Sequence, residues 1–409
     1  MYISRKFVLR LTAILLAVAS SSLKAIPAYG QEGIVVENAT VAVDYGKTIT
    51  FQAQIKTPLP IKQASILFRG INEEVTRVET IQVAGDGSTN FTYDASLNVL
   101  PPFGLVVFWF QATLTDDQTY TSSPVAFSYN DNRFPWRETS RENITVHWYA
   151  GDDAFGAAAL DSANAGLASI NEVMPASTAD PLHIYIYSNV NDLHGTLELG
   201  GEEWAGGHAD PELGVVLVAI APGAGQSIEM ETEIPHELAH VMMYRALGDG
   251  YANQPAWLIE GFASSMELYP NLEYKRALDD ASQKNNLLAF NDLCASFPAD
   301  AANAFLAYAQ SQSFVNYLRA AQGNSGITRL MDLYRDGLSC DLGATKAFGA
   351  SLDQLDRNWR ETVLGQNVAG VAARNLIPFI LLMGLVLIVP LWGAVDMLLL
   401  RRKRGQQSK

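Results

Sequence analysis

The segment His236-Glu237-Leu238-Ala239-His240 carries the clearest chemistry in this sequence of 409 residues. If the segment is helical, residues i and i+4 share one face, so both imidazoles can reach a single metal ion. Zinc accepts neutral imidazole nitrogens and usually takes four ligands. The Glu237 carboxylate would lie beside a metal-bound water rather than on the metal. The motif therefore predicts a zinc site, and a helix with two hydrogen-bonded histidines is the alternative.

A third ligand distinguishes the two readings. Nineteen residues separate His240 from Glu260, which stands within the segment PAWLIEGFA. Pro235 suits the first turn of the histidine helix, and Pro255 suits the start of a second helix that carries Glu260. A turn near Gly248 would bring that helix back antiparallel to the first. Two histidines and one glutamate leave a position open for water, as in catalytic rather than structural zinc sites.

HELAH, nineteen further residues and a glutamate within WLIEGFA together resemble the gluzincin class of zinc metallopeptidases, and most nearly its peptidase MA-like family. The resemblance covers about residues 140–365. It implies a zincin-type catalytic domain, a peptide or protein substrate, and one Zn²⁺ ion held by His236, His240 and Glu260.

The same resemblance implies a mechanism. Glu237 would act as general base on the zinc-activated water and then pass the proton to the leaving amine. An oxyanion donor is also needed, and we select Tyr308 in the segment FLAYAQSQSF, with a packed aromatic side chain as the alternative.

Two departures from related families bear on activity. Thermolysin-like enzymes place an aspartate four residues after the ligating glutamate to orient a histidine, and here that position is Ser264. The GxMEN-type segment of aminopeptidases is not visible upstream, which favours an endopeptidase or an undefined peptidase.

Both ends of the chain resemble membrane signals. Residues 1–30 combine basic residues, a short apolar run and the cleavage-like Ala28-Tyr29-Gly30, which predicts a signal peptide, with an uncleaved anchor as the alternative. Residues 376–400 are almost uncharged and long enough to span a bilayer, which predicts one C-terminal transmembrane helix, with a buried core helix as the alternative. The basic residues 401–404 follow at once and predict a cytoplasmic tail over 401–409. We therefore expect a single-pass protein of the cell membrane whose catalytic domain is extracytoplasmic.

The charge between these ends is strongly acidic. Residues 31–376 hold 42 of the 43 acidic residues but only 19 of the 28 basic ones. Phosphate would be repelled, so nucleic acid is excluded as a partner. The two cysteines, Cys294 and Cys340, could form one disulfide outside the cytoplasm, or remain as buried thiols. The oligomeric state stays open.

The chain between the two ends reads as α+β. Residues 31–132 contain seven short runs rich in β-branched and aromatic residues, which predicts an immunoglobulin-like β-sandwich that serves as a spacer or interaction module. Residues 133–370 begin with strands near 144–149, 182–187 and 215–221 and end in helices, which predicts a mixed α/β catalytic domain with a helical subdomain.

The sequence gives fewer indications of where a substrate binds. Gly214 to Ile220 could be an edge strand that pairs with an extended peptide. His208 could line the cleft, although a histidine on a surface loop is the more ordinary reading. A catalytically silent cell-surface binding protein on a protease fold is the alternative function.

Overall fold

The computed structural model describes residues 33–96, 100–197, 207–366, 370, 376–388, 390 and 392. These fall into two compact units, one drawn from Met1–Pro135 and His194–Gly201, the other from Trp136–Leu193 and Glu202–Lys409. Each unit is considered by itself. The predicted signal peptide, 1–30, and tail, 401–409, lie outside the described residues.

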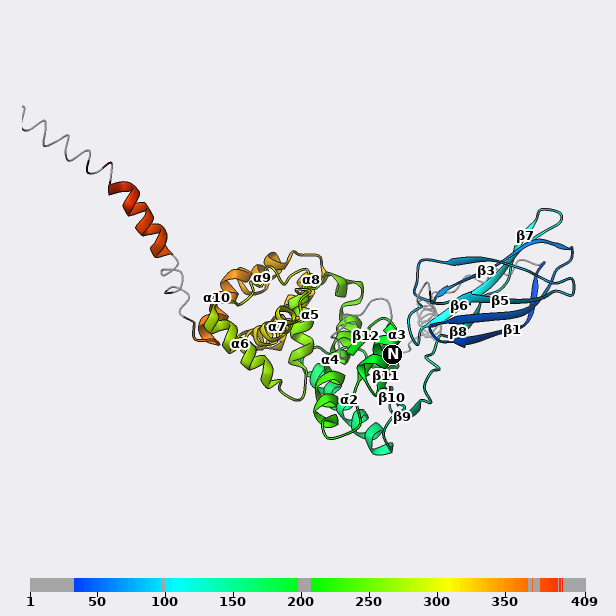
Figure 1. Cartoon of the computed structure of the whole chain (residues 1–409), viewed down its shortest axis with the longest axis horizontal. Helices are drawn as coiled ribbons and strands as arrows, with labels where there is room; N and C mark the ends of the chain where they lie inside the picture. Colours follow the sequence, from blue (N-terminus) through cyan, green and yellow to red (C-terminus); the bar gives the residue numbers. More distant parts are fainter. Residues whose placement is uncertain are drawn as a thin grey trace, which may run out of the picture. The chain divides into compact units, whose positions relative to one another are not determined.

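The first unit is a β-sandwich of two antiparallel sheets (Figure 1). Aromatic rings from both sheets pack against each other between them. The ring centroid of Phe51 lies 5.4 Å from that of Phe68 and 5.2 Å from that of Phe108. One sheet has the order β1-β2-β5 and the other β4-β3-β6-β7, with β8 also paired to β6. The strands are β1 (Val35–Asp44), β2 (Thr48–Lys56), β3 (Ile61–Gly70), β4 (Arg77–Ile81), β5 (Ser88–Asp94), β6 (Leu105–Leu114), β7 (Thr119–Thr121) and β8 (Val125–Ser128).

The predicted β region is thus confirmed, with one correction. The sequence predicts seven strands there, and the described residues form eight, because the last of the seven runs, Tyr120 to Tyr129, forms two short strands on either side of Pro124, which has no N–H to donate to a ladder.

The second unit begins with a five-stranded sheet of order β12-β13-β11-β10-β9. Its strands are β9 (Arg137–Arg141), β10 (Ile144–Trp148), β11 (Leu182–Tyr187), β12 (Gly207–Asp210) and β13 (Val215–Ala219). The three central strands run parallel, and the outer two pair antiparallel. The prediction that Gly214 to Ile220 is the edge strand is wrong. The apolar run of β13 is buried between two neighbours, and within the described residues β12 is the edge strand on that side, with β9 at the opposite edge.

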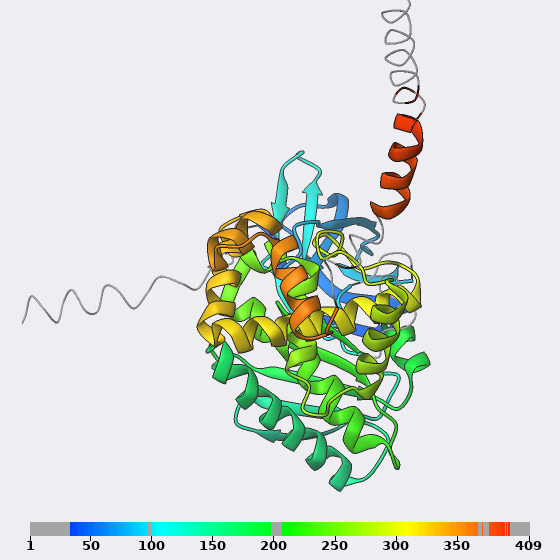
Figure 2. The same cartoon turned by 90° about the vertical axis from the view of Figure 1, so that its left-hand side faces the viewer.

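Helices complete this unit. Helices α2 (Asp153–Val173) and α4 (Gln226–Leu247) pack against each other and against the sheet. A helical group, coloured yellow-green to orange, follows in both views (Figures 1 and 2). Helix α3 (Val190–Leu197) is divided between the two units after Leu193. The other helices of this unit include the 3₁₀ helix η1 (Gly248–Asn253), α5 (Ala256–Ser265), α6 (Leu272–Lys284), α7 (Ala301–Gln322), α8 (Asn324–Arg335), α9 (Cys340–Phe348) and α10 (Leu352–Thr362).

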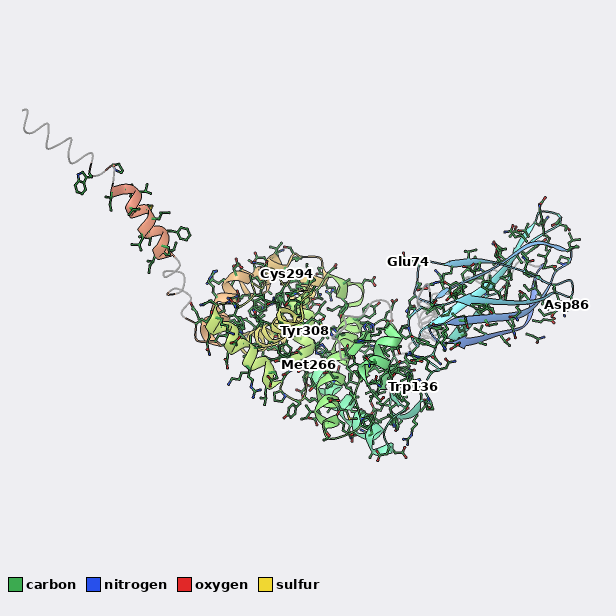
Figure 3. All side chains as sticks on the ribbon, in the orientation of Figure 1. Glu74, Asp86, Trp136, Met266, Cys294 and Tyr308 are labelled. Carbon is green, nitrogen blue, oxygen red and sulfur yellow. A yellow bond between two sulfur atoms is a disulfide. The ribbon has the colours of Figure 1, made fainter. Side chains whose placement is uncertain are left out.

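One disulfide joins Cys294 to Cys340 across this helical group, which is one of the two alternatives that the sequence leaves open; Cys294 is labelled in Figure 3. The chain at 376–388 is also helical, and its large apolar side chains are exposed. Within the residues described, no helix combines the length and apolar character that crossing a membrane requires. Most of 389–400 lies outside the described residues.

Candidate metal centre

Three side chains from two helices converge as the sequence predicts. Helix α4 supplies His236 and His240, and α5 supplies Glu260. The Glu260 Oε2 atom lies 3.6 Å from the His236 Nε2 atom and 3.7 Å from the His240 Nε2 atom. Ligands placed about 2.1 Å from a tetrahedral zinc ion lie about 3.4 Å apart, so these atoms fit such an ion closely.

The other ring nitrogens are held by the protein. His236 Nδ1 lies 3.3 Å from Glu267 Oε1 and 3.5 Å from Ser264 Oγ. His240 Nδ1 lies 3.1 Å from the Tyr251 hydroxyl. These contacts leave both Nε2 atoms for a metal ion, the arrangement typical of histidine ligands.

Sequence reasoning missed Glu267 and Tyr251. Ser264 occupies the position where an aspartate was sought, but the carboxylate that reaches His236 comes from Glu267, seven residues after Glu260. The Glu267 side chain is only 3% exposed, and its Oε2 atom has no partner among the described residues. In the sequence, an acidic residue about two helical turns after the third ligand was the signal that could have identified Glu267.

Pro235 contributes to this arrangement from an unexpected place. The prediction that it opens the helix is wrong, because α4 begins at Gln226 and Pro235 lies in its interior. A proline has no N–H, so the Glu231 carbonyl loses its helical partner. The Leu268 N–H donates to that carbonyl at 2.8 Å instead. The contact fixes the chain next to Glu267, and hence the carboxylate beside His236.

The start of α5 is also held from outside. Its N-cap residue, Pro255, makes no side-chain cap. The N–H groups of Ala256 and Trp257 donate instead to the carbonyls of Cys294 and Leu293, both at 3.0 Å. These two donors would otherwise lack helical partners. The disulfide at Cys294 therefore anchors the segment that presents Glu260.

Two of the three ligands, His240 and Glu260, have protonation tendencies that suit a metal site. Burial alone would lower the pKa of the third, His236, but hydrogen bonds to Glu260 and Glu267 outweigh it and raise that pKa. Burial lowers the pKa of His240 to about 4, so its ring is neutral at pH 7. Burial alone would raise the pKa of Glu260, but the two histidines and a hydrogen bond from Tyr308 outweigh it and lower that pKa. A neutral imidazole and an ionised carboxylate are the forms that bind zinc.

The Glu237 side chain lies next to Gly207 on the edge strand β12. This side chain is buried, and it has no hydrogen bond to the described residues. Burial raises the pKa of its carboxyl to about 8. A Cβ atom added at Gly207 would lie 2.5 Å from Glu237 Oε1. A larger residue at 207 would therefore require the Glu237 side chain to shift.

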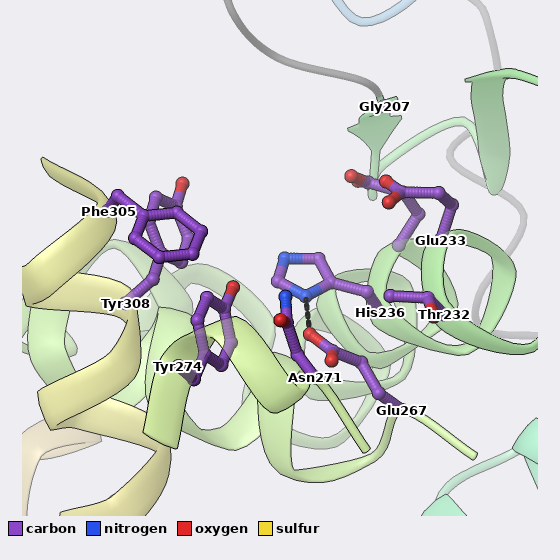
Figure 4. A pocket seen from close by; sticks show the side chains of 10 residues that line it. Gly207, Thr232, Glu233, His236, Glu267, Asn271, Tyr274, Phe305 and Tyr308 are labelled. Atoms are coloured by element: carbon purple, nitrogen blue, oxygen red, sulfur yellow. Dashed lines mark hydrogen bonds and ion pairs between the residues drawn. The ribbon is translucent and has the colours of Figure 1, made fainter. Parts of the chain in front are cut away.

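A cavity of about 190 Å³ opens beside His236 (Figure 4). Its lining combines carboxylates, polar groups and aromatic rings: Gly207, Thr232, Glu233, His236, Glu237, Glu267, Asn271, Tyr274, Phe305 and Tyr308. The predicted residue Tyr308 is therefore at the site, its ring 6.2 Å from that of His236. Its role as oxyanion donor stays a prediction. His208 lies on strand β12 rather than on a loop, is exposed, and does not line this cavity.

Comparison with known families gives one match. The model of the Peptidase MA superfamily matches residues 162–365, the range that holds every metal-binding and cavity-lining residue described above. A search of curated proteins finds no match.

Three of the solved structures that match show weak likeness to this chain. Wild-type OgpA from Akkermansia muciniphila is 14% identical, with 24% of this chain and 29% of that chain covered and a TM-score of 0.19. The β-1,3-glucan binding domain of carbohydrate-binding module family 56 is 10% identical, with 23% and 96% covered and a TM-score of 0.16. A myokine structure is 16% identical, with 22% and 89% covered and a TM-score of 0.18. Likeness this low carries no argument about fold or function.

Proposed function

Because residues 162–365 form a Peptidase MA superfamily domain with a His-His-Glu site that fits zinc, the chain is a zinc metallopeptidase, and we propose that it hydrolyses peptide bonds with Glu237 as general base. The observation that carries the proposal is the convergence of His236, His240 and Glu260 beside a cavity that Glu237 also lines.

When bound, zinc lowers the pKa of water toward about 7 and polarises a carbonyl. The other parts of the reaction fall to side chains of this chain. Glu237 lines the cavity, and no described residue donates a hydrogen bond to its carboxyl group. Burial raises the pKa of this group, but a divalent ion beside it would favour the ionised form, and that carboxylate would take a proton from the attacking water and return it to the leaving amine. Tyr308 lies on the other side of His236 from Glu233 (Figure 4). Its hydroxyl would donate a hydrogen bond to the oxyanion that forms.

The edge strand β12 supports a peptide as substrate. An extended peptide that paired with β12 would continue the sheet and exchange backbone hydrogen bonds with it. Gly207 lies against Glu237, so the backbone of such a peptide would pass directly by the general base.

Zinc-dependent cleavage of a peptide library tests the activity. The full-length chain loaded with zinc should cleave, a chelator should stop cleavage, and added zinc should restore it. Mass spectrometry of the new termini distinguishes internal cleavage from removal of terminal residues. Absence of cleavage by the zinc-loaded, folded chain across the library would contradict the proposal.

The alternative of a catalytically silent binding protein rested on the β-sandwich and on a missing partner for the ligand histidine. The contact from Glu267 to His236 argues against that alternative.

We further propose that the enzyme is exported and anchored in the cell membrane by its C-terminal segment. The Cys294–Cys340 disulfide supports an oxidising compartment. The exposed apolar helix at 376–388, followed in sequence by the basic residues 401–404, supports an anchor. Truncation before residue 376 should move the protein from the membrane fraction to the soluble extracytoplasmic fraction. A truncated protein that stays in the membrane fraction would contradict this anchor.

A further inference from the structure

Glu233 is a cavity-lining carboxylate that the proposed hydrolysis does not use. It lies on α4 one helical turn before Glu237, so the two side chains share a face of the helix. Among the described residues, no side chain donates a hydrogen bond to Glu233 or forms an ion pair with it. Burial is the main cause of a raised pKa for its carboxyl, and Glu267 and Glu229 add to it.

The described lining of the cavity contains several acidic residues and no lysine or arginine. The acidic residues are Glu233, Glu237 and Glu267. Glu260 adds a fourth carboxylate at the metal position. A divalent ion beside these carboxyl groups would favour their ionised forms, and four carboxylates would exceed its charge, so a cationic substrate group would be attracted to the cavity.

The opposite part of the cavity is aromatic. Tyr274 and Phe305 contact each other with ring centroids 5.1 Å apart, and both line the cavity across His236 from Glu233 (Figure 4). A side chain with an aliphatic stem and a charged end can contact an apolar wall and a carboxylate at the same time. Lysine and arginine have this form.

We propose that Glu233 is a specificity-determining residue that binds the cationic nitrogen of a substrate, supplied by a lysine or arginine side chain next to the cleaved bond. A free N-terminal amine would offer the same charge without the aliphatic stem. The inference rests on the proposed peptidase function, because it concerns the substrate of the same cavity.

Cleavage of matched peptides by the full-length, zinc-loaded chain gives the first test. Peptides with lysine at a varied position are compared with the same peptides carrying Nε-acetyl-lysine, which keeps the stem and removes the charge. The value of kcat/KM should be about tenfold higher for lysine, the effect expected of one charged hydrogen bond. Each pair is also made with a free and with an acetylated N-terminus. If only the free amine raises kcat/KM, that amine is the cation bound, and the proposal of a lysine or arginine side chain is overturned.

Two matched variants test whether Glu233 causes the preference for lysine over acetyl-lysine. Glu233→Gln should reduce the ratio of kcat/KM for lysine over acetyl-lysine to about one. Glu229→Gln removes the same charge from the same helix at an exposed position outside the cavity, and should keep the ratio within about twofold. Equal cleavage of lysine and acetyl-lysine peptides by the wild type, or a preference that survives Glu233→Gln, would overturn the proposal.

A binding measurement keeps this inference separate from the activity. Fluorescence anisotropy compares labelled lysine and acetyl-lysine peptides on the zinc-loaded Glu237→Gln protein, with and without Glu233→Gln. About tenfold tighter binding of lysine that requires Glu233 supports the subsite even if no peptide is cleaved. Equal binding together with active cleavage would reject the subsite and leave the peptidase function in place.

Discussion

Replacement of Glu267 by glutamine tests how the protein holds its first ligand. The carboxylate lies 3.3 Å from His236 Nδ1, and its side chain is 3% exposed. Glutamine keeps nearly the same shape but removes the charge that fixes the ring orientation and increases its basicity. Ser264 lies at 3.5 Å, a distance too long for a strong replacement bond.

Loss of such a carboxylate partner typically weakens metal binding by about 10–100-fold, or about 1.4–2.7 kcal/mol. Competition with a zinc chelator of known affinity measures the Kd for zinc directly. The exposed change Glu273→Gln on α6 is the matched control and should leave the Kd within about twofold. A folded Glu267→Gln protein with the zinc Kd of the wild type would refute the assigned role of Glu267.

Three further predictions concern the disulfide, Pro235 and His147. Serine at both Cys294 and Cys340 should lower the free energy of unfolding by up to about 4 kcal/mol in urea titrations, because the disulfide closes a span of 46 residues; an unchanged midpoint would contradict this. Pro235→Ala should restore the helical hydrogen bond that the proline removes and so loosen the partner of the ligand histidine; chelator competition should show weaker zinc binding without a lower Tm, and equal affinity would count against it. Burial, and then the nearby His183, lower the pKa of His147 to about 4, so the unfolded chain takes up this proton first as the pH falls. Stability should therefore decline between about pH 6.5 and pH 4 by up to about 1.4 kcal/mol per pH unit from this group, and His147→Gln should reduce that slope in urea titrations at several pH values.

The metal ligands could be predicted because their geometry is mostly local. The i and i+4 spacing of His236 and His240 places both rings on one face of any helix, wherever that helix begins. Glu260 was within reach because a short turn and a second helix restrict the places where it can return. The β region was predictable for a similar reason, because the alternating burial along strands such as β2 corresponds to an alternating pattern of apolar residues in the sequence.

The features that were missed depend on contacts between distant segments. Pro235 matches the usual first position of a helix, but buried residues such as Met230 hold the preceding turns of α4 in place. Glu267 reaches His236 only because the chain after α5 is held at the Glu231 carbonyl. Strand β12 is four polar or small residues, too short and too weakly patterned to be recognised, and its omission turned β13 into an apparent edge.

Hydrolysis of one peptide by the wild type and by Glu237→Gln, at equal zinc content, tests the central claim most directly. The exchange leaves His236, His240 and Glu260 unchanged, so both proteins should bind about one zinc ion per chain. Because a positioned general base contributes about 10²–10⁴-fold, kcat/KM should fall by at least about 100-fold in the variant. Equal hydrolysis by the two zinc-loaded proteins would contradict the assignment of Glu237 and the mechanism built on it.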